Sequence, residues 1–157
     1  MKLLRIVMTL LLVSVLGICK AQTAATPAFT DEDLKKYAVT MDSVKGMQQT
    51  LTGIITEMVQ KNTVMTVPRY NELFKIAADE AKLAEAKATP EEVKFLKDVA
   101  DKRKEETARI NATYQALAKE YVGLKPFNAI KKSLDTDPAV KAKFESLTKE
   151  LDSKGGE

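Results

Sequence analysis

The stretch Thr89–Val93, TPEEV, predicts the start of a helix, and a near copy of it, TDEDL at Thr30–Leu34, stands 59 residues earlier. In both stretches a threonine is followed three residues later by an acid, Glu92 or Asp33, which is the spacing of a capping box. Pro90 suits a first helical turn, where an amide hydrogen would have no partner within the helix. Two start signals of the same kind in one short chain predict an internal duplication.

Apolar side chains follow each start in two rows that repeat every seven residues, as in helices that pack in bundles or coiled coils. In the first copy the rows are Leu34, Met41, Gln48, Ile55 and Tyr37, Val44, Leu51, Met58. A shift of 59 residues places them on Val93, Ala100, Thr107, Tyr114 and Leu96, Arg103, Ile110, Leu117. The rows predict two long helices, over residues 30–61 and 89–124.

A shorter helix is predicted after each long one. PRYNEL at Pro68–Leu73 corresponds to KPFNAI at Lys125–Ile130, with a slip of two residues in the linker. The first of these helices is expected to continue to Lys87. In the second copy, Asp137 and Pro138 end one helix and begin a last one, since proline cannot continue a helix from within.

Two such hairpins in sequence predict an all-α fold, an up-down-up-down four-helix bundle in which the two long helices run parallel. The predicted bundle domain covers residues 30–152, with repeat one at 30–88 and repeat two at 89–152. Residues 153–157 are expected to form a disordered tail.

The amino terminus has the pattern of an export signal. Lys2 and Arg5 precede the apolar run Ile6–Ile18, and small residues follow at the positions that a signal peptidase reads. The run is shorter than the roughly 20 residues that span a bilayer. We therefore predict a cleaved signal peptide at residues 1–21, a flexible leader at 22–29, and an exported protein, periplasmic or secreted, without a membrane span.

Cys19 raises the alternative of a bacterial lipoprotein, in which a lipidated cysteine becomes the first residue. Ile18 precedes it, where glycine or alanine is expected, so the sequence disfavours a lipid anchor at Cys19.

Cys19 is the only cysteine and the chain has no histidine, which excludes thiolate nucleophiles and Cys or His zinc sites from the cleaved protein. Without these common catalytic groups, we predict no enzyme, no metal and no cofactor.

The charge balance argues against a nucleic-acid partner. The chain carries 25 basic and 22 acidic residues. Removal of the signal peptide takes away Lys2, Arg5 and Lys20 and no acid, so the remaining chain is close to neutral. It then lacks the basic surface that nucleic-acid binding requires.

Three polar residues, Gln48, Arg103 and Thr107, interrupt the apolar rows. In a bundle with parallel long helices, Gln48 and Thr107 lie at the same height, which predicts a polar layer in the middle of the bundle. Two interpretations remain open. Gln48 and Thr107 bond each other and set the register while Arg103 reaches water, or the layer is a small cavity in which Arg103 contacts an anionic ligand.

Gly46 and Gly53 lie seven residues apart on the outer row of the first helix. Each costs about 1 kcal/mol of helix stability relative to alanine. A partner helix that crosses closely at this face, in another protein or a second copy, would explain both glycines, and so would random sequence drift.

Asp135 and Asp137 could be considered as calcium ligands. They are interpreted as residues that end one helix and cap the next, because the glycine and the distal glutamate of an EF-hand loop are missing.

Three short motifs, DLKKYA at Asp33–Ala38, YNEL at Tyr70–Leu73, and FNAI followed by DTDP within Phe127–Pro138, resemble a family of exported bacterial proteins. The family is catalogued as domain of unknown function 4168. The resemblance implies a helical, exported protein and no known activity. Asp79 and Glu80 stand where the family's aspartate-proline would be.

From these features together we predict an exported helical structural or protein-interaction module, which binds a partner or itself. The alternative is a helical bundle that binds a small ligand.

Overall fold

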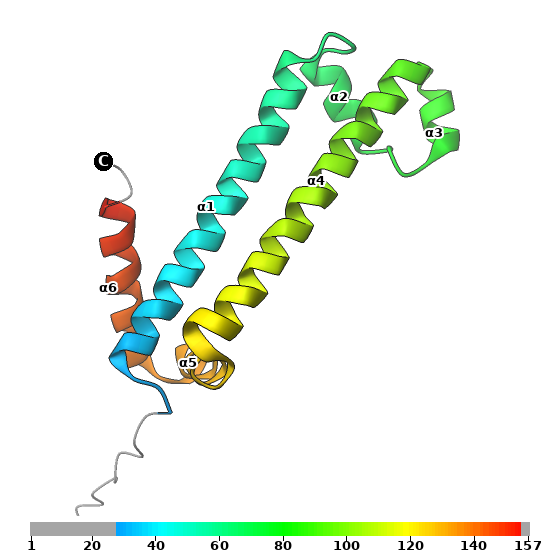
Figure 1. Cartoon of the computed structure of the whole chain (residues 1–157). Helices are drawn as coiled ribbons and strands as arrows, with labels where there is room; N and C mark the ends of the chain where they lie inside the picture. The colour runs from blue at the N-terminus through cyan, green and yellow to red at the C-terminus, as the bar shows by residue number, and fades with distance from the viewer. Residues whose placement is uncertain (1–27, 155–157) are drawn as a thin grey trace, which may run out of the picture.

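The computed structural model describes residues 28–154, which form helices and no strand (Figure 1). This confirms the predicted all-α class. The elements are α1 (Asp31–Lys61), α2 (Val67–Phe74), α3 (Glu80–Glu85), α4 (Pro90–Ala116), the π-helical segment η1 (Leu117–Gly123), α5 (Leu124–Thr136) and α6 (Pro138–Lys154). The predicted signal peptide and most of the predicted leader lie outside the described residues. Within the described part, no helix has the length and apolar character needed to cross a membrane.

Both predicted capping boxes are present at the starts of the long helices. The Thr30 hydroxyl accepts the Asp33 amide at 3.1 Å, and the Asp33 carboxylate accepts the Thr30 amide at 2.8 Å. The bond from the Thr30 amide, followed by one that the Thr30 hydroxyl donates to the same carboxylate at 2.8 Å, holds the pKa of Asp33 below its usual value. The Thr89 hydroxyl likewise accepts the Glu92 amide at 3.2 Å, and Glu92 accepts the Thr89 amide at 2.9 Å. The repeated motif therefore begins both long helices in the same way.

The two long helices, α1 and α4, lie side by side and run antiparallel (Figure 1). The end of α1, at Ile55 and Val59, packs against the start of α4 at Leu96. The start of α1, at Leu34, packs against Val122 at the far end of the second long helix. The predicted parallel alignment of the long helices is thus wrong, and so is the up-down-up-down order that required it.

The reason lies in the segment between the long helices. Residues 68–87 were expected to form one helix that returns along α1. Instead α2 has eight residues and spans about 12 Å, against about 46 Å for the 31 residues of α1. The chain therefore enters α4 at the same end where it left α1.

In both copies an aspartate starts the helix that follows the short one. Asp79 caps α3, where its carboxylate accepts the Lys82 amide at 3.1 Å. Asp137 precedes α6, and its carboxylate accepts the Ala139 amide at 2.9 Å. The expectation of an unbroken helix through Asp79 is wrong, because α2 ends at Phe74 and turns follow it. Asp79, without the proline, then supplies the cap that starts α3.

Two hydrophobic clusters close the two ends of the long pair. The first cluster consists of Ile55, Val59, Tyr70, Leu73, Leu83, Leu96 and Val99. The second cluster consists of Leu34, Tyr37, Ala118, Val122, Phe127 and Ile130. Each cluster combines the end of one copy's long helix and its following short helix with the start of the other copy's long helix. Neither copy builds a cluster by itself.

The clusters are equivalent under the duplication. A shift of 59 residues takes Tyr37 to Leu96 and Val59 to Ala118, and a shift of 57 takes Leu73 to Ile130. The two copies are thus related by an approximate two-fold axis between α1 and α4. In Figure 1 this axis exchanges the top of the molecule, with α2 and α3, for the bottom, with α5 and α6.

The limits of the helical domain differ slightly from those expected. Phe29, placed in the predicted leader, is half-buried and packs against the second cluster. Ser153, placed in the predicted tail, belongs to α6, and its hydroxyl donates to the Glu150 carbonyl oxygen at 2.8 Å.

Candidate functional site

The three polar residues singled out by the sequence are all exposed and do not form one layer. Gln48 lines a depression between α1 and α6. Arg103 and Thr107 line a different depression on α4, beside Phe74. The predicted polar layer in the middle of the bundle is therefore wrong, because these faces of α1 and α4 point to opposite outer sides of the helix pair.

Gly46 and Gly53 are also exposed. A Cβ atom built on either glycine would meet no atom within 4 Å. No helix of the described chain crosses there, so this structure does not require glycine at either position. Their role at a partner helix stays a prediction.

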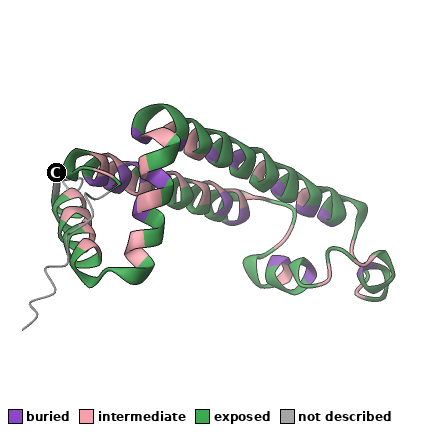
Figure 2. Cartoon of the chain, turned by 90° about the horizontal axis from the view of Figure 1, so that it is seen from below, coloured by how far each residue is buried: buried purple, intermediate pink, exposed green. Residues whose placement is uncertain are grey.

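The largest departure from the predicted burial concerns one heptad row of α4. In the neighbouring row, Leu96 and Ile110 are buried as expected. Val93, however, is 40% exposed, whereas its equivalent Leu34 in α1 is 1% exposed. Ala100 and Thr107, which continue the row of Val93, are exposed as well. Figure 2 shows buried residues on the facing sides of the long helices and exposed residues on their outer sides.

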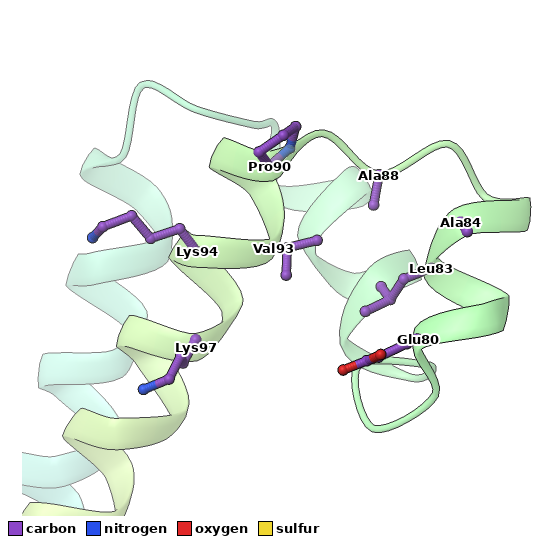
Figure 3. A pocket seen from close by; sticks show the side chains of 8 residues that line it. All are labelled: Glu80, Leu83, Ala84, Ala88, Pro90, Val93, Lys94 and Lys97. Atoms are coloured by element: carbon purple, nitrogen blue, oxygen red, sulfur yellow. The ribbon is translucent and has the colours of Figure 1, made fainter.

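A depression lies between this row and α3 at the start of α4 (Figure 3). Its volume is about 550 Å³. Leu83 of α3 and Val93 of α4 stand on facing walls, and Lys97 lies further along α4. Its complete lining is Glu80, Leu83, Ala84, Ala88, Pro90, Val93, Lys94 and Lys97. Most of this wall is apolar although it faces solvent.

A second depression follows further along α4. It is lined by Phe74, Ala100, Arg103, Lys104, Thr107, Ala108 and Asn111. Phe74 is 50% exposed, and the Arg103 guanidinium carbon lies 5.8 Å from the centre of its ring, within reach of a cation–π interaction. Among the described residues, neither Arg103 nor Lys104 forms a salt bridge. We call the face formed by Val93, Lys97, Ala100, Arg103, Lys104 and Thr107 the α4 groove.

A buried ion pair fixes α2 against the start of α4, at the upper end of the α4 groove. Arg69 Nε donates to Glu92 Oε1 at 3.0 Å, and a terminal nitrogen of Arg69 donates to Glu92 Oε2 at 3.2 Å and to the Ala86 carbonyl oxygen at 2.9 Å. The Arg69 bonds, followed by that from the Thr89 amide, lower the pKa of Glu92. The sequence identified Glu92 as a capping residue, but nothing in the spacing could identify Arg69 as its partner.

A second carboxylate, Glu106, is 4% exposed and was also missed. Lys102 Nζ lies 2.9 Å from its carboxylate, and Arg109 contacts it from the other side. The bond from Lys102 lowers the pKa of Glu106. Both buried carboxylates are therefore neutralised by cations, an arrangement that favours a structural role over proton transfer.

Tyr70 carries a buried hydroxyl that has no hydrogen-bond partner among residues 28–154. Its equivalent in the second cluster is Phe127, which has no hydroxyl. Replacement of Tyr70 by phenylalanine should raise the free energy of unfolding by about 1 kcal/mol, because an unsatisfied buried donor is removed while the ring stays. Thermal unfolding should show a rise of about 4 °C in Tm. A lower Tm would show that the hydroxyl has a partner in solution.

The site is thus a mostly apolar face with cations along one side, rather than a cluster of reactive groups. Within the described residues, no three of His, Cys, Asp and Glu lie close enough together to hold a metal ion. No family model, curated protein or solved structure matches this chain. The resemblance to the exported family 4168 therefore stays a prediction.

Proposed function

We propose that this protein is an exported helical module that acts by binding another protein. The observation that supports this most directly is the uncovered α4 groove, in which Val93 is 40% exposed, with Phe74 of α2, 50% exposed, beside its second depression. Large apolar side chains that face solvent and are bordered by charge are typical of protein–protein contacts. Export is proposed from the amino-terminal pattern of Lys2, Arg5 and the apolar run that follows them.

The alternative, a bundle that binds a small ligand, has less support. It required Gln48, Arg103 and Thr107 around one internal cavity, and Gln48 lies in a separate depression. Arg103 and Thr107 still share a wall with Phe74. That wall is an open face, whereas small-molecule sites surround most of the ligand.

The proposal is tested by site-specific photo-crosslinking in the native cell envelope. A photoreactive amino acid is placed at Val93, in the α4 groove, and in a separate variant at Gly53, on the glycine face. A discrete crosslinked protein from either position, identified by mass spectrometry, is the expected result. A third variant at Ala112, which is exposed and lines neither depression, serves as the matched control for random collisions.

The same mass spectra report the amino terminus of the protein. A first residue of Gln22 is expected if residues 1–21 are removed, and a lipidated Cys19 would show an anchored form instead. The absence of a crosslinked product from both Val93 and Gly53, together with a monomer at all concentrations in sedimentation, would rule out the proposed binding function.

A further inference from the structure

The α6 helix shows what covers the equivalent of the α4 groove on α1. It runs parallel to α1, since Lys143 Nζ lies 2.5 Å from Asp31 and Asp152 lies 2.6 Å from Lys45 Nζ, further along both helices. The Phe144 ring lies 5.7 Å from that of Tyr37. Val140, Phe144 and Leu147 form the apolar stripe of α6 that packs on the second cluster, so α6 is an amphipathic helix seated on α1.

The face of α1 beneath α6 corresponds position by position to the α4 groove. On α1, the depression beside α6 is lined by Asp42, whose equivalent Asp101 lines neither depression on α4, and by four further residues, Met41, Val44, Lys45 and Gln48. The shift of 59 residues takes these four to Ala100, Arg103, Lys104 and Thr107, and all four line the second depression on α4. The duplication therefore produced the same helix-binding face on α1 and on α4. Helix α6 covers the face on α1, and no helix of the described chain covers the face on α4.

The chain path explains why the second face is empty. The α6 helix is followed by no further element of the described chain, so it is free to lie along α1. In the first copy, the chain after α3 must enter α4 at Pro90, only a few residues later. It turns back toward the start of α4 (Figure 3) and cannot run along the groove beyond it.

We propose that the α4 groove binds an amphipathic helix of a partner protein, which lies along α4 as α6 lies along α1 and presents carboxylates to Arg103 and Lys104. This inference rests on the proposed protein-binding function and specifies its surface and the kind of partner. From Val93 to Thr107 the groove is about 21 Å long, which suits a helix of about four turns.

The charges of the α4 groove favour a distinct partner protein over a second copy of this chain. Arg103 and Lys97 replace Val44 and Ala38 of the α1 face. Lys97 is paired with Asp101, so Arg103 is the added cation that a partner can bind. A matching helix needs acidic residues along the edge of its apolar stripe. In α6 the depression is lined by Phe144, the uncharged Thr148 and Asp152. Asp152 pairs with Lys45, the equivalent of Lys104, so α6 supplies one carboxylate there and no second one for the added Arg103. In addition, α6 is already occupied on α1. A distinct, acidic partner helix therefore fits best.

The probe for this site is a fluorescently labelled peptide of residues 137–154, which contains α6 and its capping Asp137. We expect saturable binding to the purified protein in fluorescence anisotropy. The same peptide with Thr148→Glu should bind about threefold more tightly, because Thr148 and Val44, the equivalent of Arg103, line the same depression on α1, and an exposed ion pair contributes a small gain in affinity. A Phe144→Asp peptide should lose binding, since its apolar stripe is interrupted.

Variants of the protein locate the binding site. Ala100→Arg places a bulky side chain in the centre of the groove and should weaken peptide binding at least roughly tenfold through a steric clash. Ala112→Arg, the same change on the same helix outside both depressions, should leave binding unchanged. Arg103→Glu should reverse the preference, so that the Thr148→Glu peptide binds more weakly than the parent. All three positions are exposed, and unchanged thermal unfolding confirms that each variant folds.

The outcomes separate this inference from the proposed function. No peptide binding, or binding that Ala100→Arg leaves unchanged because the peptide displaces α6 from α1, would overturn the assignment of the α4 groove. A crosslinked partner from Gly53 in that case would still support a protein-binding function at another face. Loss of binding with Ala100→Arg and reversal with Arg103→Glu would support the groove directly.

Discussion

Replacement of Arg69 by alanine is expected to lower the free energy of unfolding by about 2 to 3 kcal/mol, because it leaves a buried carboxylate without its cation. The Glu92 side chain is 11% exposed and that of Arg69 25%. Arg69 also satisfies the Ala86 carbonyl at the end of α3 and bonds Glu72 at 3.1 Å. The substitution therefore loosens the connection between α2, α3 and the start of α4 together.

Urea unfolding at neutral pH measures this loss. Lys61→Ala is the matched control, because it breaks an ion pair with Glu57 whose two side chains are 76% and 60% exposed; such pairs contribute less than about 1 kcal/mol. Equal effects of the two substitutions would contradict the role assigned to Arg69. Glu92→Gln should cost less than Arg69→Ala, because glutamine keeps a capping acceptor and the Arg69 guanidinium keeps Glu72 as an ion-pair partner.

The Arg69–Glu92 pair also predicts how stability depends on pH. The pKa of Glu92 is lowered in the folded state, so the folded protein holds this proton less tightly than the unfolded chain does. The stabilisation is therefore complete above the unfolded pKa of glutamate, about 4.3, and is lost as the pH falls through the lower folded pKa. The Arg69→Ala variant should lose less stability than the parent between neutral and acidic pH.

The second large effect is expected in the two clusters. Leu73→Ala and Ile130→Ala should each lower the free energy of unfolding by about 3 kcal/mol, the usual loss for a large aliphatic core residue. Both side chains are fully buried, and the duplication places them at equivalent positions in the two clusters. The two losses should therefore be similar, although the residues lie at opposite ends of the long helices.

The measurement is urea unfolding of both single variants and of the double variant. Because the clusters do not touch, the losses should add to within about 0.5 kcal/mol if the domain unfolds as one unit. Native-state hydrogen exchange then shows whether each substitution opens its own end first. A loss below 1 kcal/mol at one position and a full loss at the other would contradict the equivalence of the two clusters.

The elements that the sequence predicted correctly are those set by local chemistry. The two capping boxes at Thr30 and Thr89, the two long helices after them, and the last helix after Asp137 all occur in the structure. These features depend on bonds between residues three or four apart and on apolar spacing along one helix. The duplication could also be predicted, because it is a similarity between two stretches of the sequence and does not depend on how they pack.

The candidate site was predicted less well. Arg103 and Thr107 do lie on one face, but Gln48 does not join them, and the buried pair of Arg69 and Glu92 had no signal in the spacing. A heptad row shows that a face is apolar without showing which element covers it. Leu34 and Val93 hold the same place in the repeat, yet one is buried and the other is exposed.

By itself, then, the sequence determined where the helices begin, which of their faces are apolar, and that the chain contains one unit twice. Only the tertiary structure decided that α1 and α4 run antiparallel, that each cluster combines both copies, and that α6 covers one of the two matching faces. The physical reason is the covalent path of the chain. The short helices α2 and α3 return it to the end it had just left, and the entry into α4 prevents the first copy from covering the face that the second copy covers with α6.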